Sequence, residues 1–308
     1  MQPRILLRNF QTLPDNVKGA IIILIGTMFL VAMTTIVKML GERLHVFQIL
    51  FLRQVFLTAV FAPVVIRNFP GALKTERPGL QILRIASALV GMTCGFTAVI
   101  HIPLADATAI SFVKAFFVTI FAIAILSEPV GVRRWAAVAI GFFGVIIMLQ
   151  PGTEGFSVYG LFALAGAAGA GMVMVLIRLL TRTERTITIM AWQAIGVGVV
   201  MAVPGIFFWQ WPTLFEWILI VVLGVVGYVG QLCNIVGYRY GEASVMAALD
   251  YFRLIYAVIF GYLIFSQLPG VNTWVGSAVI VAASLYTIHR ESRQKQVLVR
   301  TPEGRGLS

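Results

Sequence analysis

The chain has 308 residues, of which 59% are hydrophobic and only 11% are charged. A soluble domain usually carries about 25% charged residues, and a folded chain of this length leaves much of its surface facing solvent. This composition therefore excludes a water-soluble fold and indicates an integral membrane protein. The formal net charge of +11 does not indicate a nucleic-acid partner, because the basic residues lie scattered between apolar segments and form no patch.

Ten apolar segments follow one another along the chain. A helix needs about 20 apolar residues to cross ~30 Å of hydrocarbon, and turn residues such as Pro151-Gly152 separate the segments. We therefore predict an all-α integral membrane fold with ten transmembrane helices. The first segment is too long for the core of a signal peptide, so we expect it to be retained. The predicted helices are residues 17–40, 46–66, 79–100, 104–126, 134–149, 157–180, 187–207, 214–237, 242–265 and 272–288.

Lysine and arginine residues in the loops and tails indicate how these helices are oriented. If the N-terminus is cytoplasmic, the outer side carries Arg43 alone and the inner side carries fifteen basic residues. Because cytoplasmic loops are enriched in Lys and Arg, we expect a bacterial inner-membrane protein with both termini in the cytoplasm. Residues 1–16 would form a cytoplasmic segment, and residues 289–308 a basic, disordered cytoplasmic tail. The inner basic residues are Arg4, Arg8, Arg67, Lys74, Arg77, Arg133, Arg134, Arg182, Arg185, Arg239, Arg290, Arg293, Lys295, Arg300 and Arg305.

The sequence repeats itself at an offset of 139 residues, since residues 104–140 align with residues 243–279 without a gap. Each half, residues 17–149 and residues 157–288, then contains five predicted helices. Because five is an odd number, the second half is expected to be inverted relative to the first in the membrane, as in many secondary transporters. The matching positions include Gln54 and Gln193, Lys114 and Arg253, Gly131-Val132 and Gly270-Val271, and Trp135 and Trp274.

Further motifs occur where each half passes from an apolar helix through a short loop into a Gly-rich helix. They are Ala107–Phe112, Phe117–Thr119, Ser127-Glu128-Pro129 and Gly141–Val145 in the first half, and Asp250-Tyr251, Leu254, Gly261–Phe265 and Pro269 in the second. With these motifs the chain resembles the EamA family of the drug/metabolite transporter (DMT) superfamily over residues 17–288. The resemblance implies a ten-helix inverted-repeat carrier that works by alternating access, with a central cavity between the halves.

Two features distinguish this chain within the family that it resembles. Gln267 stands where the family usually has Glu, and Lys114-Ala115 stands where small polar residues and proline are common. Residues 40–45 and 51–53 are similar to carriers of the S-adenosylmethionine type. The resemblance therefore implies the fold more specifically than it implies the substrate.

Some ionisable residues lie near the ends of predicted helices. Long basic side chains at such positions can extend to the lipid headgroups, which we expect for Lys18, Lys38, Arg84 and Arg178. Glu128 lies at the inner end of the fourth helix. We interpret it as a contact at the helix end in preference to a substrate ligand.

Three basic residues lie deeper in the membrane. Lys114 is about ten residues into the fourth helix, or ~15 Å at 1.5 Å per residue, and Arg253 is at a similar depth in the ninth. Charged groups at this depth usually face a cavity or a partner. Two equivalent cations at the midplane suit a carrier of anions or zwitterions, and Arg53 is either a third binding group or a structural tie.

Asp250 is the one deep acidic residue, three positions before Arg253 and on the same helix face. Two interpretations remain open. The carboxylate either neutralises Arg253 and helps it insert, or it exchanges its partner, or a proton, during transport.

Aromatic and amide residues complete a predicted cavity, although each of them could instead pack in the interior or lie in the interfacial belt. Stripes of small residues such as Gly166–Gly171 indicate close helix packing. The candidates for the cavity are Trp192, Gln193, Tyr228, Gln231, Asn234, Tyr251 and Tyr256.

We predict a secondary active transporter of a small polar or zwitterionic metabolite, such as an amino acid, S-adenosylmethionine or riboflavin. A lipid or amphiphile flippase and a non-transporting membrane scaffold are the alternatives. An enzyme is not expected, because His45, His101 and His289 lie near loops or the tail and no nucleotide-binding, metal or nucleophile motif occurs. We expect no cofactor and no metal; the partners would be a small-molecule substrate and the lipid bilayer, and a homodimer is left open.

Overall fold

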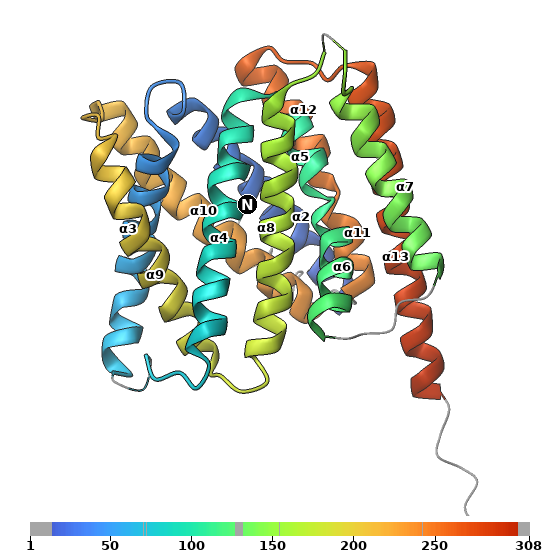
Figure 1. Ribbon diagram of the computed structural model, residues 1–308, viewed down its shortest axis with the longest axis horizontal. Helices are drawn as coiled ribbons and strands as arrows, with labels where there is room; N and C mark the ends of the chain where they lie inside the picture. The colour runs from blue at the N-terminus through green and yellow to red at the C-terminus, as the bar shows by residue number, and fades with distance from the viewer. Residues whose placement is uncertain are drawn as a thin grey trace, which may run out of the picture.

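The computed structural model describes residues 14–69, 71, 73–126, 132–153, 155–241 and 243–300. Most of the N-terminal segment, the last eight residues and the Ser127-Glu128-Pro129 motif lie outside the described residues, so the expectation for Glu128 stays a prediction. All regular structure in the described part is helical (Figure 1). The helices are α2 (Asp15–Leu40), α3 (Val46–Arg67), α4 (Pro78–His101), α5 (Leu104–Ser111), α6 (Lys114–Leu126), α7 (Val132–Leu149), α8 (Val158–Leu180), α9 (Thr186–Phe207), α10 (Leu214–Tyr240), α11 (Ala243–Asp250), α12 (Phe252–Phe265) and α13 (Val271–Arg300).

Seven helical stretches are long and apolar enough to cross a membrane, and three shorter apolar helices accompany them. The chain is therefore a multi-pass membrane protein with an all-α fold. The seven are Asp15–Leu40, Pro78–His101, Leu104–Leu126, Val158–Leu180, Ile187–Phe207, Leu214–Tyr240 and Val245–Phe265, and the shorter three are Val46–Val60, Trp135–Leu149 and Val271–Thr287.

Two of the predicted helices are interrupted in the middle. The stretch predicted for residues 104–126 divides into α5 and α6 at Phe112-Val113, and the stretch predicted for residues 242–265 divides into α11 and α12 at Tyr251. Phe112 and Tyr251 are 139 residues apart, the offset of the sequence repeat. The two breaks therefore lie at equivalent positions of the two halves.

The last helix is longer than the sequence prediction. We predicted that it ends at residue 288 before a disordered tail, but α13 continues to Arg300. The prediction was wrong because it followed hydropathy alone. Residues 289–300 contain good helix formers such as Glu, Arg, Gln and Lys, and they include no glycine or proline that would end a helix.

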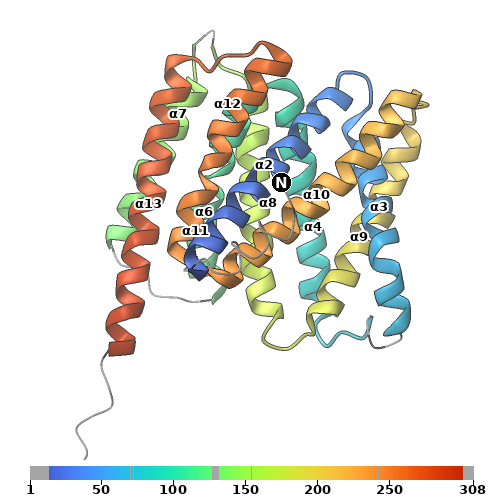
Figure 2. The ribbon, with the colours of Figure 1, turned by 180° about the vertical axis from the view of Figure 1, so that it is seen from behind.

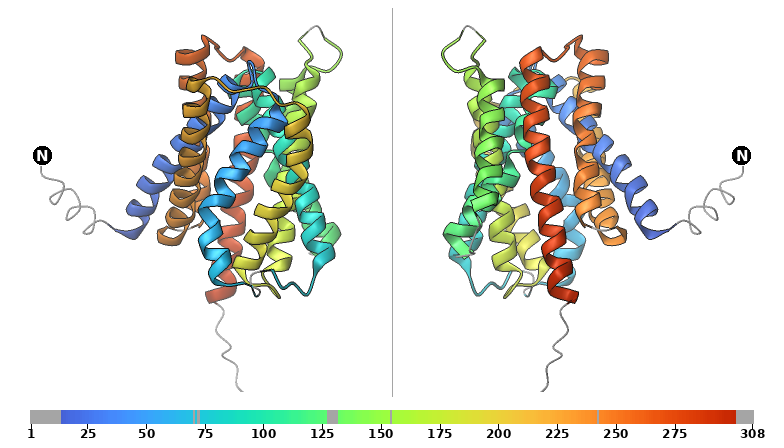
Figure 3. Two further views of the ribbon diagram at one scale, coloured as in Figure 1. Left: turned by 90° about the vertical axis from the view of Figure 1, so that its left-hand side faces the viewer. Right: turned by 90° about the vertical axis from the view of Figure 1, so that its right-hand side faces the viewer.

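The helices pack in pairs that run across the two halves. α2 packs along α10, α4 along α8, α3 along α9, and α7 along α13. Figures 1 and 2 show α3 and α9 at one end of the bundle and α7 and α13 at the other, with the remaining helices between them. Figure 3 shows α2 leaning across the bundle and α13 running its full height. At the repeat offset α2 corresponds to α8 and α4 to α10, so the α2–α10 and α4–α8 pairs are equivalents.

Glycines allow the central helix pairs to approach closely. A Cβ atom on Gly169 of α8 would lie 2.6 Å from the backbone nitrogen of Gly91 in α4, and one on Gly166 would lie 2.8 Å from Gly95. In the equivalent pair, a Cβ atom on Gly26 of α2 would lie 2.8 Å from the Cβ of a cysteine in α10. The packing role predicted for the small residues of 166–171 is confirmed.

Replacing Gly169 by alanine is expected to destabilise the fold. The new methyl group would meet backbone atoms, which cannot move aside as a flexible side chain can, and overpacking of this kind costs about 1–3 kcal/mol. The matched control is Gly95→Ala on α4, because a Cβ atom there meets nothing within 4 Å. Thermal unfolding of the detergent-purified protein should show a lower midpoint for Gly169→Ala and an unchanged or higher one for Gly95→Ala. Equal midpoints would contradict the packing argument.

Candidate functional site

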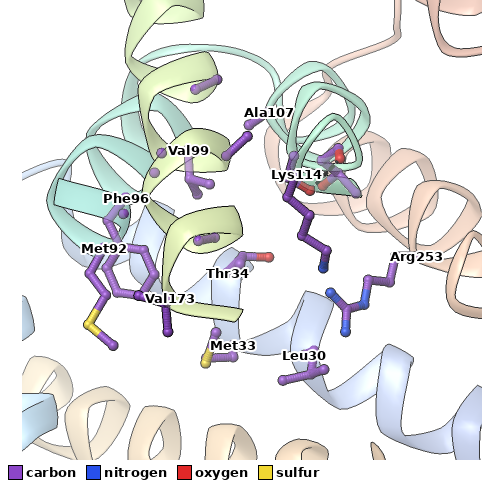
Figure 4. Close-up of a pocket in the computed structure, with 18 of the residues that line it drawn as sticks. Leu30, Met33, Thr34, Met92, Phe96, Val99, Ala107, Lys114, Val173 and Arg253 are labelled. Atoms are coloured by element: carbon purple, nitrogen blue, oxygen red, sulfur yellow. Dashed lines mark hydrogen bonds between the residues drawn. The ribbon is translucent and has the colours of Figure 1, made fainter. Parts of the chain in front are cut away.

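A cavity of about 370 Å³ lies at the centre of the bundle. Residues of α2, α4, α5, α6 and α8 form most of its wall, with Gln193 of α9 and Arg253 of α12 completing it. Figure 4 shows a polarised arrangement, in which Met92, Phe96 and Val173 lie on one side and Lys114 and Arg253 on the other. The cavity therefore offers an apolar wall and a basic end.

The helix breaks place the two basic residues in this cavity. Lys114 is the first residue of α6 and Arg253 the second residue of α12. Next to Lys114, Phe112 and Val113 are 3% and 0% exposed, so the break is anchored in the apolar interior. The rings of Phe112 and Tyr251 meet edge to face with centroids 4.6 Å apart, so that the two equivalent breaks touch.

Hydroxyl groups assist the first break. Thr108 donates to the carbonyl of Leu104 at 2.7 Å and Ser111 donates to that of Thr108 at 2.6 Å. Side-chain bonds of this type compete with the regular helical pattern and often bend helices. The end of α5 before Phe112 is therefore encoded in the polar residues of its last two turns.

Lys114 and Arg253 come from different halves and meet in the cavity. Figure 4 shows the Lys114 amine and the Arg253 guanidinium pointing toward each other, above Leu30 and beside Thr34 of α2. Two of the residues predicted to bind substrate are thus brought together. Their role in binding stays a prediction.

Asp250 forms the predicted ion pair with Arg253. One carboxylate oxygen, Oδ1, lies 2.8 Å from Arg253 Nε, and the two side chains are 16% and 18% exposed respectively. Asp250 is not among the residues that line the cavity in the described part of the chain. The carboxylate therefore contacts Arg253 without forming part of the cavity wall.

Arg84 does not extend to the headgroups, which corrects the sequence prediction. It is only 3% exposed and donates to the carbonyl of Ile189 at 2.9 Å and to the side-chain oxygen of Gln193. Both acceptors belong to α9, which packs against α4. Because Gln193 lines the cavity, Arg84 holds one of its polar groups in position from outside.

Lys38 is a second correction of the same kind. Its side chain is 5% exposed, and Nζ donates to the carbonyls of Val99, Ile100 and Ile102 at 3.0, 3.2 and 2.6 Å. These carbonyls lie at the C-terminal end of α4, where helical partners are missing. A buried lysine therefore caps a neighbouring helix.

The other two basic residues of this group stay near helix ends. Lys18 pairs with Asp15 at 3.0 Å at the start of α2, and Arg178 is exposed near the end of α8. Their positions near helix ends match the sequence prediction.

Four other predicted site residues do not line the cavity. The Arg53 guanidinium lies 5.8 Å from the ring centroid of Phe96, so it stands behind the apolar wall. Trp192 donates from Nε1 to the carbonyl of Leu73 at 3.0 Å, in the loop before α4. Tyr251 packs on Phe112, and Tyr256 packs against the central apolar cluster. Tyr and Trp side chains have polar tips that can be satisfied away from a ligand, which explains the difference.

The apolar wall was missed by sequence reasoning. Met33, Met92 and Phe96 line the cavity, as do Gly91 and Gly95, and none of them differs from core residues in the sequence. The one available signal was the run of small residues in α8, which leaves space beside it. No group of three or more His, Cys, Asp or Glu side chains suited to a metal occurs among the residues that the structure describes.

Comparison with known proteins identifies the family of this chain. The profile of the EamA-like transporter family matches residues 17–150 and again residues 158–288. The chain belongs to the EamA-like transporter family. Its two matched segments correspond to the two halves of the sequence repeat.

Relatives in the EamA-like family carry transporter names. An S-adenosylmethionine uptake transporter of Rickettsia bellii is 31% identical over 256 residues, which cover 83% of this chain and 88% of the relative. A riboflavin transporter of Brucella anthropi is 29% identical, covering 79% and 88%, and a pseudopaline exporter of Pseudomonas aeruginosa is 26% identical, covering 87% and 94%. This EamA-like protein is therefore a membrane transporter of a metabolite.

A solved crystal structure shares the fold. It aligns with a TM-score of 0.58 and 18% sequence identity, covering 91% of this chain and 99% of its own. At this identity the similarity shows the fold alone.

Replacing Lys38 by methionine is expected to destabilise this EamA-like protein. Methionine keeps the apolar stem but leaves three buried carbonyls without their donor, a loss of about 1–3 kcal/mol. Lys18→Met on the same helix is the matched control, and its partly exposed ion pair should be worth less than about 1 kcal/mol. The measurement is the unfolding midpoint in detergent. If both variants lowered the unfolding midpoint by the same small amount, the capping role of Lys38 would be contradicted, and the headgroup position predicted from the sequence would be favoured.

Proposed function

We propose that this chain is a secondary active carrier of a small polar or zwitterionic metabolite, built from ten transmembrane helices in two inverted five-helix repeats. The seven long apolar stretches, together with the three shorter apolar helices, support a count of ten spans. The twofold match of the family profile and the equivalent α2–α10 and α4–α8 pairs support the two-repeat arrangement. The distribution of Lys and Arg supports a bacterial inner-membrane location with both termini in the cytoplasm.

The observation that carries this proposal is the central cavity with Lys114 and Arg253 at one end. Ligand cavities of about 300–1,000 Å³ hold small molecules, and this one has about 370 Å³. Cations inside a membrane protein usually mark a substrate pathway. An amino acid, S-adenosylmethionine or riboflavin fits this description, and two relatives are named for the last two.

Alternating access requires contacts on each side of the cavity that can open in turn. On the proposed outer side, Arg43 donates to Glu216 and to the carbonyl of Trp211, which ties the first half to the second. This hydrogen bond to Glu216 raises the pKa of Arg43 above its usual value. On the proposed inner side, the Glu184 carboxylate accepts from the backbone N–H groups of Glu76 and Arg77 at 2.8 and 3.2 Å.

A flippase for lipids or amphiphiles is the second candidate, because the cavity has one apolar wall and one basic end. Its size favours a small molecule over a lipid with two acyl chains. We further propose that the chain is not an enzyme, with the bilayer and its small-molecule substrate as its partners and no nucleic acid.

A ligand screen followed by a flux assay tests the proposed function. The detergent-purified protein is heated with single metabolites, including amino acids, S-adenosylmethionine and riboflavin. A ligand at 100 times its dissociation constant stabilises the folded state by about 2.7 kcal/mol, which is readily seen. Uptake of a stabilising metabolite into proteoliposomes would support the carrier. Failure of every stabilising compound to cross the membrane would contradict it.

Lys114→Gln and Arg253→Gln are each expected to reduce this flux at least about tenfold, which corresponds to 1.4 kcal/mol of lost interaction. Each variant removes one of the two cations at the basic end of the cavity and leaves a neutral polar amide in its place. Both proteins should remain folded, as judged by gel filtration. Lys18→Gln, which removes a charge outside the cavity, should transport normally. Normal flux through either cavity variant would move the substrate site elsewhere.

A further inference from the structure

The charges around the central cavity do not balance. Lys114 and Arg253 line it, while Asp250 is the one acidic side chain that pairs with either of them in the described part of the chain. The Lys114 amine makes no hydrogen bond or ion pair with any residue that the structure describes. Among the residues that line the cavity or pair with its lining residues, two cations and one carboxylate leave one positive charge in excess; Arg53 stands behind the apolar wall and is not included in this balance. A buried charge without a counter-ion is costly, so the occupied site requires a compensating negative charge.

The geometry of the ion pair leaves Arg253 free to bind on its cavity side. Asp250 meets Arg253 at Nε, the nitrogen nearest the backbone, at 2.8 Å. Neither Arg253 Nε nor Asp250 Oδ1 makes a hydrogen bond with a described residue, so this contact is an ion pair only. The four N–H donors on the two terminal nitrogens of the guanidinium lie beyond this contact. In Figure 4 this terminal edge points toward Lys114. A carboxylate or another anionic group between them would bond to the edge of Arg253 and to the Lys114 amine together.

The backbone contributes in the same direction. α6 and α12 both begin next to the cavity, with 13 and 14 residues respectively. The N-terminus of a helix carries a partial positive charge, which favours an anion. At the start of α6 the backbone N–H groups of Ala115, Phe116 and Phe117 already donate to the carbonyls of Phe112 and Val113, so the contribution is that of the helix dipole. Half-helices that begin at a central site serve this purpose in other inverted-repeat transporters.

The side chains opposite the two cations indicate what the other end of the ligand must be like. Met33, Met92 and Phe96 supply apolar surface, and Figure 4 places Met92 and Phe96 across the cavity from the two cations. Arg53 lies 5.8 Å from the Phe96 ring centroid without lining the cavity itself, which stabilises the ring from behind. A flat or aliphatic body fits between these side chains.

We infer that the substrate carries one anionic group on an apolar body, and that Asp250 is the specificity-determining residue that limits this negative charge to one. Among the candidates of the proposed function, this retains those with one carboxylate, the amino acid and S-adenosylmethionine, and excludes riboflavin. This inference rests on the proposed function, since it assigns the substrate class of the same site. Asp250 is a positioning residue for Arg253 and does not touch the ligand. Removing its charge would raise the excess at the site from one positive charge to two.

The test compares probes that share a phenyl group and differ in charge. These are 3-phenylpropanoate with one negative charge, benzylmalonate with two, zwitterionic phenylalanine and cationic phenethylamine. Dissociation constants are measured by calorimetry on the full-length protein in detergent. The wild type should bind 3-phenylpropanoate at least about tenfold more tightly than phenethylamine, since a unit charge at ~8 Å in a protein is worth more than this factor.

Charge variants then separate specificity from structure. In Asp250→Asn, the affinity for benzylmalonate relative to 3-phenylpropanoate should rise about tenfold. In the double variant Asp250→Asn/Lys114→Gln, where the excess returns to one, the ratio should return to its wild-type value. Asp106→Asn is the matched control, because this carboxylate accepts from Thr273 at 2.7 Å outside the cavity and should leave the ratio unchanged. A purely structural Asp250 would weaken both probes equally.

Several outcomes would overturn the inference. They are an unchanged ratio in Asp250→Asn, tighter binding of phenethylamine than of 3-phenylpropanoate, and no binding of either carboxylate to the wild type. If Asp250→Asn does not fold, the single variant Lys114→Gln tests the inference instead. In this variant the charges of Arg253 and Asp250 cancel, so the site should no longer prefer 3-phenylpropanoate to phenylalanine. Failure of this test together with measurable metabolite flux would remove the substrate class and keep the carrier. The expected selectivity without flux of any ligand would remove the carrier and keep the binding site.

Discussion

A charged side chain inside a membrane-spanning bundle has no water to solvate it, and four cations in the described part of this protein illustrate that constraint. Lys38 has three carbonyls at the end of α4, and Arg84 has a carbonyl and the Gln193 side chain on α9. Arg253 has Asp250. Lys114 lines the cavity and makes no hydrogen bond or ion pair in the described structure, which is why we propose that its partner is the substrate.

Close helix packing determines where the cavity lies. Gly91 and Gly169 bring the backbones of α4 and α8 into contact at one level. Gly95 has open space on its Cβ side, and it lines the cavity together with Gly91. Since side chains are small along this seam, the volume that would be filled in an ordinary core remains available to a ligand.

The paired helix breaks connect this packing to transport. Phe112 and Tyr251 stand at equivalent positions of the two halves, touch each other, and are each followed within two residues by a basic residue of the cavity. A break allows one half of a helix to move while the other stays packed. In the proposed mechanism, a ligand held by both Lys114 and Arg253 would contact the two elements that a rearrangement would displace, so that its binding energy would favour the conformational change.

The sequence by itself determined the all-α membrane-spanning character of the chain, the repeat offset and the ion pair between Asp250 and Arg253. Hydropathy, internal repetition and i, i+3 spacing are properties of short segments, and they hold whatever the neighbours are. The equivalence of Lys114 and Arg253 followed from the repeat, and both residues line the cavity.

Only the tertiary structure decided which buried groups find partners and which side chains line the cavity. The Lys38 acceptors lie more than 60 residues along the chain, and the Arg84 acceptors more than 100. No local pattern reports such distances. Trp192 and Phe96 look equally suited to a cavity in the sequence, yet Trp192 bonds to a loop and Phe96 forms the wall. The rotation of each helix against its neighbours makes this choice, and that rotation exists only once the helices are packed.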